Sequence, residues 1–64
     1  MTPADLLAWQ AHMGLSQRAA ADALGVTHAT YSGWVLGKVP IKHVVALACA
    51  ALAAGLKPWV KDAA

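Results

Sequence analysis

Few side chains in this chain are able to do covalent chemistry, and their spacing is not that of a catalytic site. The only carboxylates are Asp5, Asp22 and Asp62, of which Asp5 falls at a predicted helix start and Asp62 in the tail. The single cysteine, Cys49, excludes an internal disulfide, and no group of His and Cys has the spacing of metal ligands. We therefore expect no enzymatic activity, no metal, no cofactor and no small-molecule substrate.

The remaining polar side chains are suited to hydrogen bonding, and the most informative of them follow Gly25. A histidine such as His28 can donate to or accept from a purine edge, and the methyl group of Ala29 can touch that of thymine. The residues that we predict to contact DNA bases are Thr27, His28, Ala29 and Ser32. The alternative is an ordinary solvated helix surface on which Thr27 acts only as a cap.

Two short helices, predicted over 17–24 and 28–36, must position these residues. Ser16 and Thr27 stand just before them, where a hydroxyl oxygen accepts from otherwise unpaired amides of the first turn. Gly25 stands at the end of the first helix, where a positive φ favours glycine. A helix, a glycine turn and a second helix are the pattern of the helix-turn-helix, whose second helix enters the major groove of DNA.

Two further helices are predicted, one on each side of this segment. Thr2 and Pro3 form a capped helix start, and the helix continues to Met13 with an inward stripe of Leu6, Trp9 and Met13. After a short loop, a fourth helix is predicted from Ile41 to Gly55. The fold class is therefore all-α, a compact domain of four to five helices.

The expected core sets large rings against small side chains. The buried face of the helix over 17–24 is small, and we assign to it Ala20, Ala21 and Ala23. The inward positions of the next helix are predicted to be Thr30, Tyr31 and Trp34. Close packing then requires that the rings of that helix, together with Trp9, supply the missing volume.

Gly33 lies inside a predicted helix, where glycine costs about 1 kcal/mol relative to alanine. One explanation is that a side chain at this position would collide with a binding partner. The other is tight packing inside the chain, or simple tolerance of the glycine.

The helix over 41–55 is apolar nearly all round, which a domain of this size cannot bury alone. Its inward stripe is predicted to be Ile41, Val44, Val45, Ala48 and Leu52, with Cys49, Ala50 and Ala53 outside it. We expect a two-fold homodimer built on this helix and the following tail, over 41–60. The predicted interface residues are Leu47, Ala50, Ala51, Ala54, Trp59 and Val60. Trp59 and Val60 are expected to pack across the dimer or back on the domain.

Length and composition fit one small domain over 1–64 with a helix-turn-helix over 16–36. The chain is 59% hydrophobic, too apolar for disorder, and its formal charge of +2 permits nucleic-acid binding without requiring it. Its first residues do not have the pattern of a signal peptide, so we expect none, and the apolar run over 44–54 is too short to cross a bilayer. We expect a cytoplasmic, nucleoid-associated protein with no membrane partner.

The chain resembles the lambda-repressor-like, Cro-type (XRE-type) family of bacterial and phage regulators, most of all small phage Cro-type and anti-CRISPR-associated repressors. The residues that carry the resemblance are Gly14-Leu15-Ser16-Gln17, Ala21, Leu24-Gly25-Val26-Thr27, Tyr31-Ser32-Gly33-Trp34, Gly37-Lys38 and Pro40-Ile41. The chain departs from the family in two features. The family commonly has Arg, Gln or Asn at the outward positions of the second helix, which here are His28, Ala29, Ser32 and Gly33, and it often has Glu where this chain has Val35. The resemblance implies a dimer that binds a palindromic operator and represses its own operon.

The resemblance also implies contacts to the DNA backbone. In the family, the position of Gln17 donates to a phosphate at a helix N-terminus, and the loop after the second helix grips the backbone. The predicted phosphate contacts are Ser16, Gln17, Arg18, Lys38, Lys42 and His43. The alternatives are a solvated Gln17, an exposed Arg18 charge, and basic residues that serve only solubility.

The function predicted from these features is a homodimeric, sequence-specific regulator of double-stranded DNA. The alternative is a protein-interaction module, such as an adaptor or antitoxin-like subunit, whose apolar last helix docks a different chain. A membrane-surface helix is disfavoured because the last helix lacks a basic polar face.

Overall fold

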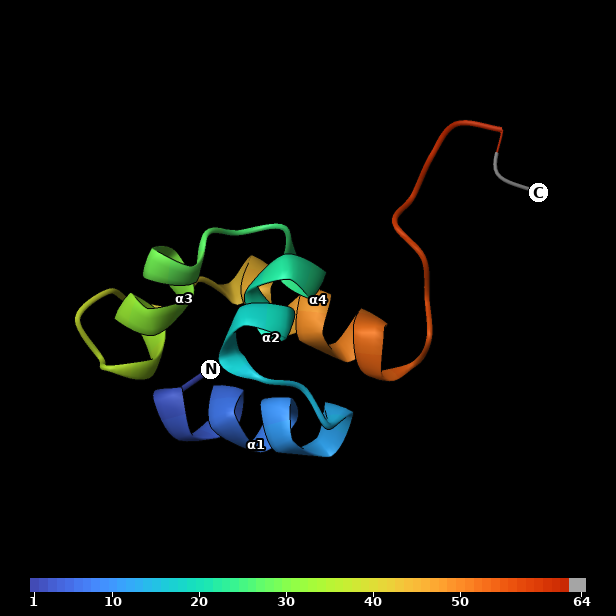
Figure 1. Cartoon of the computed structure of the whole chain (residues 1–64). Coiled ribbons are helices and arrows are strands. Elements are labelled where there is room, and N and C mark those ends of the chain that lie inside the picture. The colour runs from blue at the N-terminus through green and yellow to red at the C-terminus, as the bar shows by residue number, and fades with distance from the viewer. Residues whose placement is uncertain (63–64) are drawn as a thin grey trace.

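The computed structural model describes residues 1–62, and the described part of the chain contains four α-helices and no strand (Figure 1). The helices are α1 (Pro3–Met13), α2 (Gln17–Leu24), α3 (His28–Val35) and α4 (His43–Ala53). The predicted all-α class is confirmed. The last two positions of the predicted 1–64 domain lie outside the described residues.

Side-chain caps fix the beginnings of the first three helices, as their sequences predict. The Thr2 hydroxyl accepts from the Asp5 amide at 3.1 Å, while the Asp5 carboxylate accepts from the Thr2 amide at 2.9 Å. These hydrogen bonds from Thr2 lower the pKa of the Asp5 carboxyl group. Ser16 and Thr27 accept from amides three residues on in the same way.

Glycine ends the first two helices where the chain must change direction. Gly14 and Gly25 have φ of 68° and 73°, in the left-handed region that other residues adopt only with strain. After Gly25, the amide of Val26 donates back to the carbonyl of Ala21 at 3.0 Å, which closes the end of α2. The turn is therefore short and fixed, and it sets the angle at which α3 leaves α2.

The core combines large rings from α1 and α3 with the small face of α2. The buried apolar residues are Leu6, Trp9, Ala20, Ala21, Tyr31, Trp34, Val45 and Cys49. Tyr31 and Leu6 are fully buried, and the Tyr31 and Trp34 rings meet edge to face with centroids 6.3 Å apart. The predicted packing of rings against Ala20 and Ala21 is confirmed.

One side-chain hydrogen bond joins α3 to α1 across the core. The Tyr31 hydroxyl donates to Gln10 Oε1 at 2.9 Å, which gives the polar end of a buried ring its partner. Burial, and to a lesser extent the nearby Cys49 thiol, raise the pKa of Tyr31. Burial alone raises the pKa of Cys49, so this α4 thiol is a protonated core group at neutral pH.

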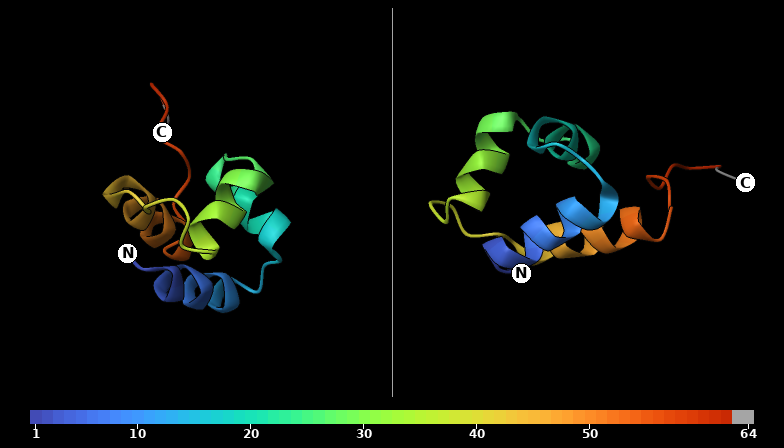
Figure 2. Two further views of the ribbon diagram at one scale, coloured as in Figure 1. Left: turned by 90° about the vertical axis from the view of Figure 1, so that its left-hand side faces the viewer. Right: turned by 60° about the horizontal axis from the view of Figure 1, so that its bottom comes forward.

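The four helices pack around this core. α3 packs against both α1 and α2, and α4 packs against α2 and α1 (Figure 2). Beyond α4, the chain over 56–62 leaves the helical body as an extended tail (Figure 1). No helix within residues 1–62 is long and apolar enough to cross a membrane.

The predicted limits and inward face of the fourth helix need correction. The helix begins at His43 rather than Ile41 and ends at Ala53 rather than Gly55. Val44, assigned to the core, is 64% exposed, whereas Cys49, placed outside the stripe, is 2% exposed. Because the sequence is apolar all round, its periodicity does not define which side faces inward.

Two inward assignments on the helix-turn-helix are also wrong. Ala23 is exposed, because the buried face of α2 is formed by Ala20 and Ala21 with Leu24 half-buried beside them. Thr30 is exposed as well, since Tyr31 and Trp34 already define the inward face of α3. The tail residues Trp59 and Val60 do not pack back on the domain, because both are exposed.

Leu6 and Leu7 offer a matched test of this core, because they are adjacent on α1 and differ in burial. Leu6 is fully buried and Leu7 is 41% exposed. We predict that Leu6→Ala lowers the free energy of unfolding by about 2–5 kcal/mol, because a cavity replaces a buried side chain. Leu7→Ala should lower it by less than about 1 kcal/mol. Urea denaturation followed by circular dichroism measures both, and equal losses would contradict the packing of α1.

Candidate nucleic-acid interface

The first turn of α3 presents a bare surface while the rest of the helix is anchored in the core. Thr27, His28, Ala29 and Thr30 are all exposed, and Tyr31 directly after them is fully buried. Of the predicted base contacts, only Ser32 is half-buried. Three of the four therefore share one accessible end of the helix, and small side chains there allow close approach to a flat or grooved partner.

The hydroxyl group of Thr27 is largely used inside the chain. It accepts from the Thr30 amide at 3.2 Å and donates to the Thr30 hydroxyl oxygen at 2.9 Å. Its proton is therefore engaged, and only one lone pair remains for a partner. The Thr30 hydroxyl shares this hydrogen bond and lies on the exposed side of the helix.

Thr30 is thus a candidate contact residue that the sequence-based interpretation placed in the core. The spacing in the sequence could have indicated this position. Thr30 comes three residues after the N-cap Thr27, so its hydroxyl lies next to the cap and away from the side of α3 that buries Tyr31. Thr30 extends the polar surface of α3 by one donor and one methyl group.

Gly33 is explained by packing inside the chain rather than by a partner. A Cβ atom at this position would lie 3.1 Å from Cγ2 of Val39, tighter than ordinary van der Waals contact. The same segment is pinned by backbone bonds, since the amides of Lys38 and Val39 both donate to the Gly33 carbonyl at 2.9 and 3.2 Å. The glycine lets the loop after α3 fold back onto the helix.

The N-terminus of α2 has the geometry of an anion-binding helix end. Ser16 caps it, Gln17 is half-buried at its first position, and Arg18 is exposed. Unlike α1, which carries Asp5, α2 and α3 have no acidic residue in their first turns. The positive ends of these two helix dipoles are therefore not neutralised by the chain itself, which favours an external anion.

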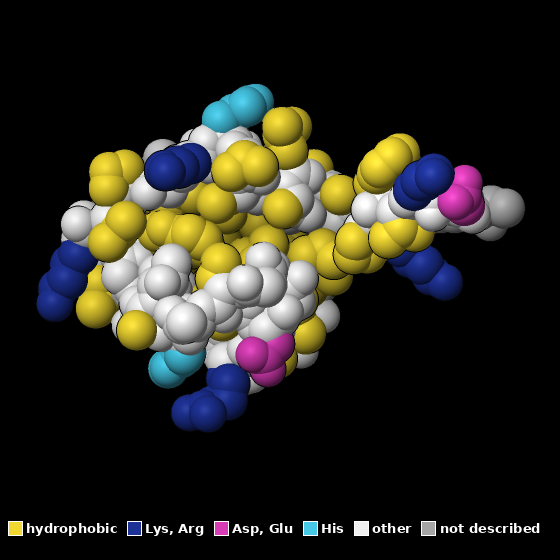
Figure 3. Space-filling view, turned by 90° about the horizontal axis from the view of Figure 1, so that it is seen from above, with side chains coloured by type: hydrophobic (Ala, Val, Ile, Leu, Met, Phe, Trp, Pro, Cys, Tyr) yellow, Lys and Arg dark blue, Asp and Glu magenta, His cyan; other side chains and the backbone are white. Residues whose placement is uncertain are grey.

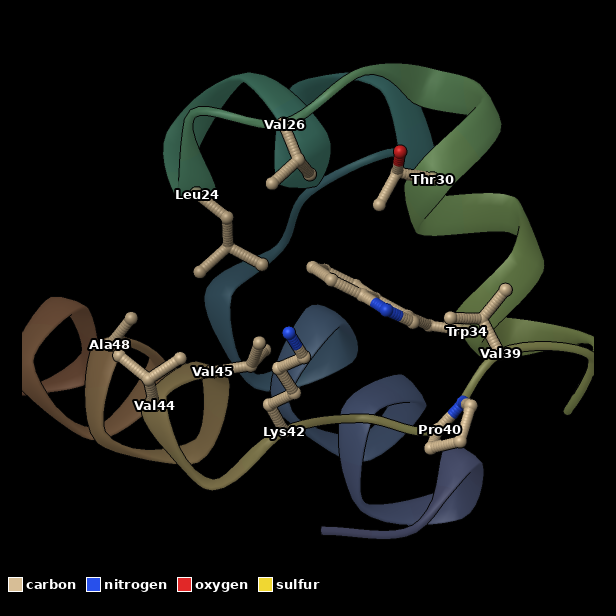
Figure 4. Close-up of a pocket in the computed structure, with 10 residues that line it drawn as sticks. All are labelled: Leu24, Val26, Thr30, Trp34, Val39, Pro40, Lys42, Val44, Val45 and Ala48. Atoms are coloured by element: carbon tan, nitrogen blue, oxygen red, sulfur yellow. The ribbon is translucent and has the colours of Figure 1, made fainter.

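The loop between α3 and α4 contributes the remaining predicted phosphate contacts. Lys38, Lys42 and His43 are all exposed, and Gly37 with φ of 73° turns the chain directly before Lys38. Lys42 occupies the N-cap position of α4 without a side-chain cap bond. A lysine ammonium has no acceptor with which to cap a helix start, and the Lys42 amine points into the space between α3 and α4 (Figure 4).

That space is a largely apolar groove of about 430 Å³, which we call the α3–α4 groove. Its walls include Leu24, Val26, Trp34, Val39, Val45 and Ala48, with Thr30 and Lys42 as its polar members (Figure 4). A second open groove of about 580 Å³ adjoins it, sharing Leu24 and Ala48 and reaching to Trp59 in the tail. Together they form an apolar hollow across one face of the molecule (Figure 3).

The predicted dimer residues lie on the accessible side of α4 and in the tail. Leu47 is 57% and Trp59 88% exposed, while Ala50, Ala54 and Val60 are exposed and Ala51 is half-buried. Val44 adds to this face, although it was assigned to the core. Such a run of exposed apolar side chains on one helix and the adjoining tail is typical of a protein-protein interface.

The architecture defines an all-α helix-turn-helix protein. A family model described as helix-turn-helix matches residues 10–53, which include all of α2, α3 and α4. The chain belongs to this helix-turn-helix family, of the XRE type that includes Cro-like and lambda-repressor-like regulators. No curated protein and no solved structure was found to match it. Family membership supports a DNA-binding regulator.

The contact between Gly33 and Val39 can be tested with a double-mutant cycle. Alanine inside a helix is about 1 kcal/mol more favourable than glycine, but here its Cβ would crowd Val39. We predict that Gly33→Ala alone leaves stability nearly unchanged, because the two effects oppose each other. In a Val39→Ala background, Gly33→Ala should stabilise by about 1 kcal/mol in urea denaturation. A change of equal size in both backgrounds would mean that Val39 is not the reason for the glycine.

Proposed function

We propose that this protein is a homodimeric repressor that binds an inverted-repeat operator through α3. The observation that carries the proposal is the exposed first turn of α3, held by two buried rings one turn further on. A helix so anchored can enter the major groove without losing its packing. Two copies related by a two-fold axis would present these helices to successive major grooves, roughly 34 Å apart.

The proposed contacts divide into base contacts and backbone contacts. His28 is the main base reader, with Thr30, Ala29 and Ser32 beside it, and Thr27 retains one acceptor. Ser16, Gln17 and Arg18 at the start of α2 bind one phosphate group, and Lys38, Lys42 and His43 bind the backbone on the other side of the groove. Because few base donors are available, DNA shape contributes part of the specificity.

The dimer is proposed to form through the exposed face of α4 together with the tail. The domain covers residues 1–64, with the helix-turn-helix over 16–36 and the dimerisation region over 41–60. Repression follows from the dimer's occupation of an operator that overlaps a promoter. Selection of bound sequences from a random oligonucleotide pool, using the purified full chain, identifies the operator. Recovery of no common inverted repeat would refute the proposal.

A protein-interaction module remains the second candidate, and the exposed apolar residues on α4 and the tail favour it as much as they favour a homodimer. Sizing of the purified protein separates the two. A stable dimer supports the repressor, whereas a monomer that becomes soluble and ordered only with a co-expressed partner supports the module.

His28 should read one position in each half-site of the selected operator. We predict that His28→Ala reduces discrimination at that position by about 1–3 kcal/mol, because the base edge loses its hydrogen-bond partner. Preference at all other positions should stay the same. Fluorescence anisotropy on a panel of single-base operator variants measures the effect, and an unchanged preference profile would remove His28 from this role.

Arg18 and Lys61 carry the same charge and permit a matched test of the backbone contacts. Arg18→Ala should weaken binding to every sequence alike and, because the dimer carries two copies of Arg18, reduce the slope of log K against log salt by about 2. Lys61→Ala, in the tail and outside the proposed interface, should leave that slope unchanged. The slopes come from titrations over a series of salt concentrations. Equal effects of the two variants would show that only net charge matters.

A further inference from the structure

Among the large apolar side chains of residues 1–62, Trp59 is the most exposed, at 88%. It lies on the tail that leaves α4. Its neighbours Leu56 and Val60 are 62% and 56% exposed. An apolar segment of this kind is a ready binding element, because burying an aromatic side chain removes a large area from water. The tail therefore requires a site that covers it.

The α3–α4 groove is such a site. Its volume of about 430 Å³ falls within the range of pockets that enclose organic ligands. The ring of Trp34 lies across it, and the aliphatic side chains of Leu24, Val26 and Val45 surround that ring (Figure 4). An indole that enters can stack on or pack edge-on to Trp34 and contact these side chains.

On its own chain, the tail stops short of this groove. Trp59 lines only the adjoining groove, which shares Leu24 and Ala48 with the α3–α4 groove, and it stays 88% exposed there. The α3–α4 groove extends further toward the beginning of α4, beside Lys42 and Val45. The tail also leaves the body in another direction (Figure 1).

A second copy can supply the indole that this groove does not receive from its own chain. Where two α4 helices pair antiparallel about a two-fold axis, the end of one lies beside the beginning of the other. The tail of each copy then starts next to the α3–α4 groove of its partner. We propose that Trp59 of each copy inserts into the α3–α4 groove of the other, so that the two chains exchange their tails. This inference rests on the proposed homodimer and specifies how it is held together.

The areas are consistent with this arrangement. Stable specific interfaces bury about 1,200–2,000 Å² in total. Two buried aromatic side chains contribute about 300–500 Å² from the tails alone. The exposed Val44 and Leu47 on α4, together with the walls of the two grooves, are available for the remainder. Tryptophan is also among the residues that most often dominate binding energy.

Sedimentation equilibrium of the full chain tests the role of Trp59. We expect Trp59→Ala to raise the dissociation constant of the dimer at least tenfold, because the indole is lost from its site. Lys57→Ala, an exposed change in the same tail, should alter it by less than twofold. A wild-type protein that is monomeric would refute the proposed dimer. A wild-type dimer whose dissociation constant is the same in Trp59→Ala would refute the tail exchange alone.

Cross-linking tests where the tail is seated. In a Cys49→Ala background that keeps Trp59, Val60→Cys and Val26→Cys are combined and the protein is oxidised with glutathione disulfide. Tail exchange predicts a covalent dimer on a non-reducing gel, with much less from either single cysteine variant. A disulfide within one chain, or no disulfide, would overturn the proposed position of Trp59.

Discussion

Tyr31 is the core residue that connects α3 to the helices packed against it. Its ring is fully buried, its hydroxyl donates to Gln10 of α1, and the Cys49 thiol of α4 is near enough to contribute to the rise in its pKa. The alanines of α2 leave room for this ring and for Trp34 beside it. The large rings of α3 can therefore be buried only because the facing side chains of α2 are small. Because the rings anchor α3 from its middle onward, its first turn is free to face outward without loss of packing.

The parts of the fold that depend on local interactions could be predicted from the sequence. The caps at Thr2, Ser16 and Thr27 join atoms three residues apart, and Gly25 marks a change of direction that few other residues allow. Three helix starts and the turn between α2 and α3 were therefore predictable. The start of α4 was not, because Lys42 at its N-cap makes no side-chain cap bond. The inward side of α4 was not predictable either, since its apolar residues surround the helix and tertiary contacts select Cys49 over Val44.

In the candidate site, too, local features could be predicted from the sequence and features that depend on tertiary contacts could not. Exposure of His28 and Ala29 followed from their place at the beginning of a capped helix. Thr30 was assigned inward, but the side chains of Tyr31 and Trp34 already fill the core side of α3. The reason for Gly33 could not be found from the sequence, because it depends on how the loop after α3 returns and places Val39 over the helix. A contact between a helix and a loop that folds back on it cannot be predicted from the sequence alone, even when the two residues are close in the chain.

Trp34 belongs to two environments at once. One part of its ring meets Tyr31 in the core, and another forms a surface of the α3–α4 groove. It is carried by the same helix that presents His28. Any molecule that settles against Trp34 therefore touches the helix proposed to contact DNA, next to Thr30 and Lys42, which line the same groove. If a molecule in the groove bound one tilt of that helix more tightly than another, it would change the affinity for the operator, and the operator would change the affinity of the groove by the same factor.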